Sequence, residues 1–176
     1  MDKTKLYAKI TIMQRILIIK TSSLGDVIHN LPIISDIKRH YPNVIIDWVV
    51  EESFADIPRL HTGVNSVITV AVRRWRKALF ERNTWAEMAQ FKANIQAQKY
   101  DLIIDTQGLI KSSAMSLLAN GVTHGYDKQS IREPFASRFY KIKHCVSRRL
   151  HAVERNRLRL LYNNFKTNSF KTQNRD

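Results

Sequence analysis

The sequence predicts an α/β fold in which helices flank a parallel sheet. Short apolar runs rich in β-branched residues alternate with segments whose apolar residues recur at three- and four-residue steps. Strands separated by helices are typical of right-handed βαβ units, which build parallel sheets. The chain has 176 residues, of which 44% are hydrophobic and 25% charged. This size and composition correspond to about one globular domain.

The predicted strands are apolar runs bounded by polar or turn residues. The first, RILIIK at residues 15–20, is β-branched along most of its length, as expected of a buried strand. A turn follows it before the next helical pattern begins. The same reasoning predicts strands, in chain order, over residues 15–20, 44–50, 67–72 and 102–105, with a short fifth over 123–125.

Helical spacing of apolar residues separates these strands. Pro32 lies inside the first helical pattern and should kink it or delay its regular part, and Pro58 interrupts the second. In the third, a stripe of large apolar side chains from Trp85 to Ile95 is expected to pack in the core. Helices are predicted over residues 26–40, 51–60, 84–99, 111–118 and 151–162.

The chain ends differ in character from its middle. Residues 1–12 are predicted to be an N-terminal extension without the apolar segment of a secretory signal. Residues 163–176 are polar and aperiodic and are predicted to be a disordered tail, which leaves 13–162 as the domain. The single cysteine, Cys145, excludes an internal disulfide framework and fits a reducing cytoplasm. The histidines show no metal-ligand spacing, so no metal site is predicted.

The charge of the chain is strongly basic, with a formal net charge of +14 at pH 7. Residues 71–99 carry seven Lys and Arg against two acids, and residues 132–176 carry twelve against three. Such a surface implies a polyanionic partner: nucleic acid, an anionic membrane face or a phosphorylated ligand. Charge alone does not choose among these three.

The turn after the first strand is the first candidate for a binding site. Ligands of open α/β sheets bind beyond the carboxyl ends of the strands, where the run Lys20–Asp26 (KTSSLGD) lies. Gly25 permits a close backbone approach or a positive φ, and Ser22 and Ser23 offer hydroxyls. The run matches neither GxGxxG nor GxxxxGK[ST]. Asp26 is either a helix-capping acid or a general base at the mouth of a cleft.

Six blocks in collinear order carry a resemblance to a known family. They are ILIIKTSSLGDVIHNLP, DWVVEESFADIP, VAVRRWRKALF, YDLIIDTQGLIKSS, HGYDKQSIREPFASRFY and HAVER, within residues 13–162. Together they resemble the bacterial lipopolysaccharide heptosyltransferases of glycosyltransferase family 9. Members of that family have two Rossmann-like domains in the GT-B arrangement. The resemblance implies that residues 13–162 form the N-terminal, Rossmann-like, acceptor-binding domain, and that the C-terminal nucleotide-sugar domain is absent.

The resemblance also implies a chemistry. The family transfers heptose from ADP-L-glycero-D-manno-heptose to the 5-hydroxyl of Kdo in the lipid A inner core, with inversion. It implies that Asp26 is the base that deprotonates this hydroxyl, and that Ser23 and Gly25 line the acceptor site beside it. No bound cofactor is implied. Further acceptor-binding residues implied by the resemblance are Arg73, Arg74, Arg76, Lys77, Gln107 and Arg132.

Other interpretations of the same residues stay open. Arg73–Lys77 could be a solvated charged loop with Trp75 as a packing anchor, and Gln107–Gly108 a plain strand-to-helix turn. The implied partners are Kdo-lipid A, the inner leaflet of the inner membrane and a separate C-terminal half, for a peripheral protein on the cytoplasmic face. The alternatives are a non-catalytic remnant and a basic nucleic-acid-binding α/β domain, for which the sequence has no RNP, KH or helix-turn-helix signature.

Overall fold

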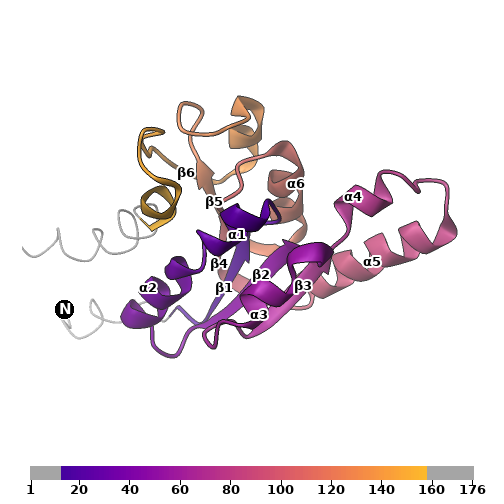
Figure 1. Ribbon diagram of the computed structural model, residues 1–176, viewed down its shortest axis with the longest axis horizontal. Coiled ribbons are helices and arrows are strands. Elements are labelled where there is room, and N and C mark those ends of the chain that lie inside the picture. The colour runs from indigo at the N-terminus through magenta and orange to yellow at the C-terminus, as the bar shows by residue number, and fades with distance from the viewer. Residues whose placement is uncertain (1–12, 158–176) are drawn as a thin grey trace, which may run out of the picture.

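A six-stranded, fully parallel sheet forms the centre of the protein, whose computed structural model describes residues 13–157 (Figure 1). The strands lie in the order β3-β2-β1-β4-β5-β6. After β3 the chain crosses to the other side of β1, so the strand order reverses between β1 and β4. The crevice beyond such a reversal is where doubly wound sheets bind ligands. The strands are β1 (Arg15–Ile19), β2 (Ile45–Glu51), β3 (Ser66–Val70), β4 (Lys99–Asp105), β5 (Asn120–Tyr126) and β6 (Ile142–His144).

Helices cover both faces of this sheet and give it two cores. Alternate residues of a strand point to opposite faces. On one face Ile16 and Trp48 pack in a cluster with α1, α2 and α3, and on the other Leu17 and Val49 pack in a cluster with α4, α5 and α6. The helices are α1 (Leu24–Ile28), α2 (Pro32–His40), α3 (Asp56–Arg59), α4 (Val72–Trp75), α5 (Arg82–Gln96) and α6 (Ile110–Leu118), with 3-10 turns η2 (Glu52–Phe54) and η3 (Pro134–Phe139).

The α/β prediction is confirmed, with differences at the prolines. The predicted helix over 26–40 is divided into α1 and α2, and Pro32 stands at the start of α2. The first turn of a helix tolerates proline because its N–H would have no intrahelical partner there. The short helix expected over 51–60 is divided into η2 and α3.

One expectation about local structure was wrong, and two elements were not predicted. Trp85 was expected in the core but is exposed, while Phe91 and Ile95 of the same stripe are buried. The first turns of α5 project beyond the sheet, so they have no sheet to pack against (Figure 1). The sequence also did not predict η3 or β6, because the three residues of β6 contain one apolar side chain and no alternating pattern.

The predicted extension over 1–12 and tail over 163–176 lie outside the described residues, as does the end of the helix predicted over 151–162. Residues 152–157 are helical. In the part of the chain that the structure describes, no helix is long and apolar enough to cross a membrane.

Candidate active site at the carboxyl edge of the sheet

The candidate site lies where β1 and β4 end side by side. The two strands pair in register up to Ile19 opposite Asp105. The turn after β1 leads into α1 through Ser23, and the turn after β4 leads into α6 through Gln107. Both turns therefore lie at the point where the strand order reverses. The sequence predicted that the first of them lies at the carboxyl edge of the sheet, but not the strand order.

Asp26 is held at the start of α1 and remains partly exposed. Its Oδ2 accepts hydrogen bonds from the Ser23 amide at 3.1 Å and the Ser23 hydroxyl at 3.3 Å. Its Oδ1 lies 3.9 Å from Nζ of Lys20, and 40% of the Asp26 side chain is accessible. The capping role is thus confirmed, and it leaves Oδ1 as the oxygen with fewer donors. Capping therefore fixes the orientation of a carboxylate that is still partly exposed to solvent.

Lys20 is a site residue that the sequence analysis did not assign. Its side chain is buried, and Nζ lies 3.4 Å from the carbonyl oxygen of Thr106 as well as near Asp26. The sequence did contain a signal for this role, because Lys20 directly follows the apolar run of a buried strand. Its ammonium group thus contacts Asp26 at the start of α1 and Thr106 in the turn after β4.

Gln107 holds the first turn in place. Its Oε1 accepts hydrogen bonds from the amides of Thr21 and Ser22, both at 3.2 Å. The backbone of the turn that contains Gln107 depends on Gly108, which has a φ of +69°. The positive φ favours glycine at this position, and a Cβ added there would lie 3.0 Å from a side-chain carbon of Ile131, which would have to shift slightly. The positive φ expected as one possibility for Gly25 occurs here instead.

Gly25 contributes open space. A Cβ built on it would meet no atom within 4 Å. Arg132 is exposed on the segment between β5 and η3, next to Glu133. The Glu133 carboxylate accepts a 2.7 Å hydrogen bond from the amide of Ile110, at the start of α6. Ser23, Gly25, Asp26 and Gln107 therefore lie around the strand-order reversal, and Arg132 follows on the β5 side.

Glu51, at the end of β2, ties the turn after β1 to α4. Its amide donates to the carbonyl oxygen of Thr21 at 3.1 Å, and its Oε1 accepts from the amide of Arg73 at 3.1 Å. Glu51 is buried. The basic segment at residues 73–77 is thus fixed to the same edge of the sheet as Asp26, on the far side of β2.

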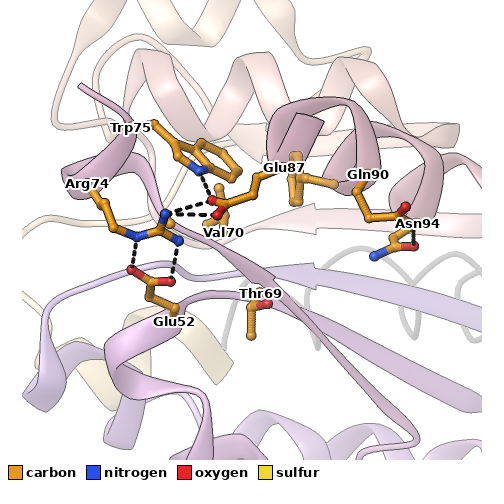
Figure 2. Close-up of a pocket in the computed structure, with 10 residues that line it drawn as sticks. Glu52, Thr69, Val70, Arg74, Trp75, Glu87, Gln90 and Asn94 are labelled. Carbon is orange, nitrogen blue, oxygen red and sulfur yellow. Dashed lines mark hydrogen bonds and ion pairs between the residues drawn. The ribbon is translucent and has the colours of Figure 1, made fainter. Parts of the chain in front are cut away.

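The four cations of this segment are not equivalent. The Arg74 guanidinium is bound by two carboxylates: it donates to Glu52 at 2.9 and 3.1 Å and to Glu87 at 2.9 Å (Figure 2). Arg74, for which the resemblance implies acceptor binding, thereby connects η2, α4 and α5. Arg73 lies over the Phe54 ring at 5.5 Å, and Arg76 and Lys77 are exposed.

Trp75 and Glu87 complete this connection. The Trp75 indole donates a 2.6 Å hydrogen bond to Glu87, and the Trp75 ring packs on Phe91 with ring centres 6.1 Å apart. Hydrogen bonds from Arg74 and then Trp75 hold the pKa of Glu87 below its ordinary value of 4.5. The packing-anchor interpretation of Trp75 is therefore confirmed. These groups line a small cavity of about 190 Å³ against residues 87–94 of α5 (Figure 2).

Known proteins match both this sequence and this arrangement. The family model "Glycosyltransferase family 9 (heptosyltransferase)" matches residues 88–174. Lipopolysaccharide heptosyltransferase 1 of Escherichia coli K12 is 53% identical over 144 residues, which cover 81% of this chain and 45% of the relative. The Pseudomonas aeruginosa protein of the same name is 49% identical over 144 residues, covering 81% of this chain and 41% of the relative. The chain belongs to glycosyltransferase family 9.

Solved structures of family 9 share the fold. E. coli heptosyltransferase WaaC with ADP-2-deoxy-2-fluoro heptose superimposes with a TM-score of 0.82 and 51% identity, over 85% of this chain and 48% of WaaC. A family 9 structure from Veillonella parvula, 17% identical, superimposes with a TM-score of 0.70 over 85% of this chain and 41% of that one, which shows the fold alone. This family 9 chain spans about half the length of the relatives it matches.

The contacts of Arg74 and Trp75 with Glu87, which we name the α4 tie, should make the stability of this family 9 chain depend on pH. Because the folded state lowers the pKa of Glu87, the tie stabilises fully above the ordinary glutamate pKa of 4.5 and is lost as pH falls through the lowered value. We expect Glu87→Gln to reduce the free energy of unfolding at neutral pH and to lose this effect as pH falls through the lowered pKa of Glu87. Urea unfolding of both proteins across this range measures it. An equal difference at every pH would show that the Glu87 charge does not stabilise the fold.

Proposed function

We propose that this chain is the N-terminal, acceptor-binding domain of a lipopolysaccharide heptosyltransferase of the GT-B architecture, bounded by residues 13–162. The enzyme would transfer heptose from ADP-L-glycero-D-manno-heptose to Kdo of the lipid A inner core. About 50% identity to lipopolysaccharide heptosyltransferase 1 from three organisms supports this proposal. The observation that carries it is Asp26, an oriented and partly exposed carboxylate at the strand-order reversal.

The proposed reaction needs one base and no covalent intermediate. Oδ1 of Asp26 takes the proton of the acceptor 5-hydroxyl, and the resulting oxygen attacks the anomeric carbon of the heptose from the face opposite the leaving group. The bond from that carbon to the phosphate oxygen breaks, and ADP leaves with the electron pair. Inversion at the anomeric carbon follows from this single displacement. Lys20 keeps the Asp26 carboxylate oriented by its ion pair at 3.9 Å.

The other proposed roles divide between positioning and binding. Gln107 positions the turn that carries Ser23, and Gly25 leaves room for the sugar beside Asp26. Arg73, Arg76 and Lys77 bind the carboxylates and phosphates of Kdo-lipid A, for which guanidinium groups are suited. Arg132 contributes from the β5 side, while Arg74 keeps α4 in place. The donor would bind to a C-terminal domain of the enzyme.

The proposed acceptor is a lipid, which places the protein peripherally on the cytoplasmic face of the inner membrane. The test of the proposed function is ADP release with ADP-heptose and Kdo-lipid A, using this chain with the C-terminal half of the E. coli relative. We expect acceptor-dependent release from the mixture and none from either part alone. A folded mixture without release would favour the non-catalytic alternative.

Neutralising the exposed arginines should weaken acceptor binding in a salt-dependent way. We expect Arg73→Gln with Arg76→Gln to raise the Kd for Kdo-lipid A at low ionic strength, and the difference from the parent to shrink at high salt because exposed charges are screened. Titration at two ionic strengths measures it, and Lys92→Gln with Lys99→Gln, which removes two exposed cations outside residues 73–77, is the charge-matched control. Equal loss at both ionic strengths would contradict a charge-based role.

A further inference from the structure

The segment between α4 and α5 presents apolar side chains to solvent at a place where the fold does not need them. This segment together with the first turn of α5, residues 76–85, is named the α4–α5 tip, and it projects beyond the edge of the sheet (Figure 1). Phe80 is fully exposed, Leu79 is 47% exposed and Trp85 is 59% exposed. Single exposed apolar residues are normal on protein surfaces, but three large ones within seven positions mark an interaction site.

The tip is an ordered turn. The Trp85 indole donates a 2.8 Å hydrogen bond to the carbonyl oxygen of Leu79, and the Glu81 amide donates to the carbonyl oxygen of Ala78 at 3.1 Å. Thr84 is buried beneath the turn. These contacts hold Phe80 outward, so little conformational entropy would be lost when a partner covers it.

Cations surround the apolar residues. Arg76, Lys77 and Arg82 are exposed, and within residues 13–157 none of the three takes part in an ion pair. Glu81 is the single acid of the tip. The acids that could neutralise this region from α5 and η2, Glu87 and Glu52, are already bound to Arg74. The tip therefore combines exposed apolar side chains with an excess of positive charge. We name its three cations, Arg76, Lys77 and Arg82, the collar.

We propose that the α4–α5 tip docks on the surface of an anionic lipid bilayer. Phe80 and Leu79 enter the boundary between headgroups and acyl chains, Trp85 lies at headgroup level, and the collar contacts lipid phosphates. Aromatic side chains favour this interface, and each basic residue near an anionic leaflet adds attraction. A protein partner would not by itself require both features together.

The position of the tip gives docking a consequence for the site. The tip follows α4, which begins at the carboxyl end of β3, and Glu51 ties α4 to the turn before Asp26. Docking therefore brings the lipid surface close to the α4 end of the carboxyl edge of the sheet. This inference deepens the membrane partner of the proposed function, but its test requires no heptose transfer.

Binding to vesicles tests the proposal directly. We expect this chain to bind vesicles of phosphatidylcholine with phosphatidylglycerol and to bind pure phosphatidylcholine vesicles far less. Phe80→Ser should weaken binding to the anionic vesicles about tenfold or more. Leu60→Ser, which alters another exposed leucine away from the tip, should leave binding unchanged. Each of the substitutions Arg76→Gln, Lys77→Gln and Arg82→Gln should lower the affinity for anionic vesicles about fivefold at low salt.

Tryptophan fluorescence distinguishes insertion from loose attraction to a basic protein. Of the three tryptophans, Trp48 and Trp75 are buried, so a change in emission on adding vesicles reports Trp85. We expect a blue shift with the parent chain and none with Phe80→Ser.

Two results would overturn the proposal. One is equal vesicle binding by the parent and Phe80→Ser, each folded by circular dichroism. The other is a dimer in sedimentation that Phe80→Ser dissociates, which would assign the tip to a second copy. Heptose transfer to a lipid-free Kdo acceptor, measured in the mixture with the C-terminal half, separates the two proposals. Phe80→Ser should retain this transfer. Absence of the transfer with the parent chain would count against the proposed function alone.

Discussion

Asp26→Asn is expected to lower the turnover of heptose transfer by about 10²–10⁴-fold, the range for loss of a general base. Asparagine keeps the size of the side chain and an oxygen that can accept from the Ser23 amide, but it cannot take a proton from the acceptor hydroxyl. Acceptor affinity should therefore change little. Initial rates of ADP release, measured with the C-terminal half present, give kcat and KM separately.

The matched control for this substitution is Asp56→Asn. Asp56 is also in the first turn of a helix, but its side chain is 93% exposed and pairs with Arg59. It should leave turnover unchanged. If Asp26→Asn retained the parental kcat while both proteins were folded, Asp26 would be a capping residue only. Loss of both activity and α1, seen by amide hydrogen exchange, would also remove the support for a base.

Asp105→Ala is expected to cause the largest loss of stability, about 3–5 kcal/mol in the free energy of unfolding. The carboxylate is fully buried, and Oδ1 accepts from the amides of Gln107 at 2.8 Å and Gly108 at 3.2 Å. Its Oδ2 accepts from the Tyr140 hydroxyl at 2.6 Å. Alanine would leave all three donors without this partner inside the protein, where an unpaired polar group is costly.

Urea unfolding of Asp105→Ala, Tyr140→Phe and the double variant measures this effect and its origin. Tyr140→Phe removes one donor and should cost less than Asp105→Ala. The double variant should cost less than the sum of the two, because the two groups share a hydrogen bond. A loss below about 1 kcal/mol for Asp105→Ala would show that the turn after β4 does not depend on this carboxylate.

The sequence alone determined the alternation of strands and helices. Runs such as RILIIK are buried because a parallel sheet has helices on both faces, so nearly every side chain of such a strand must be apolar. The position of Asp26 was also predictable, because a strand followed by a turn and a helix places the turn at the carboxyl edge. The same local rules predicted Gln107 at the end of a neighbouring strand.

The tertiary structure decided which charges are paired and which apolar faces are covered, because local sequence patterns carry no information on contacts between distant residues. Arg74 and its neighbours look alike in sequence, yet Glu52 and Glu87, 22 and 13 residues distant, bind Arg74 and leave Arg73 and Arg76 exposed. Trp85 has helical spacing with Met88, but the sheet does not reach the first turn of α5. Periodicity reports which face of an element is apolar. Whether another element covers that face, or neutralises a charge on it, depends on contacts between distant residues.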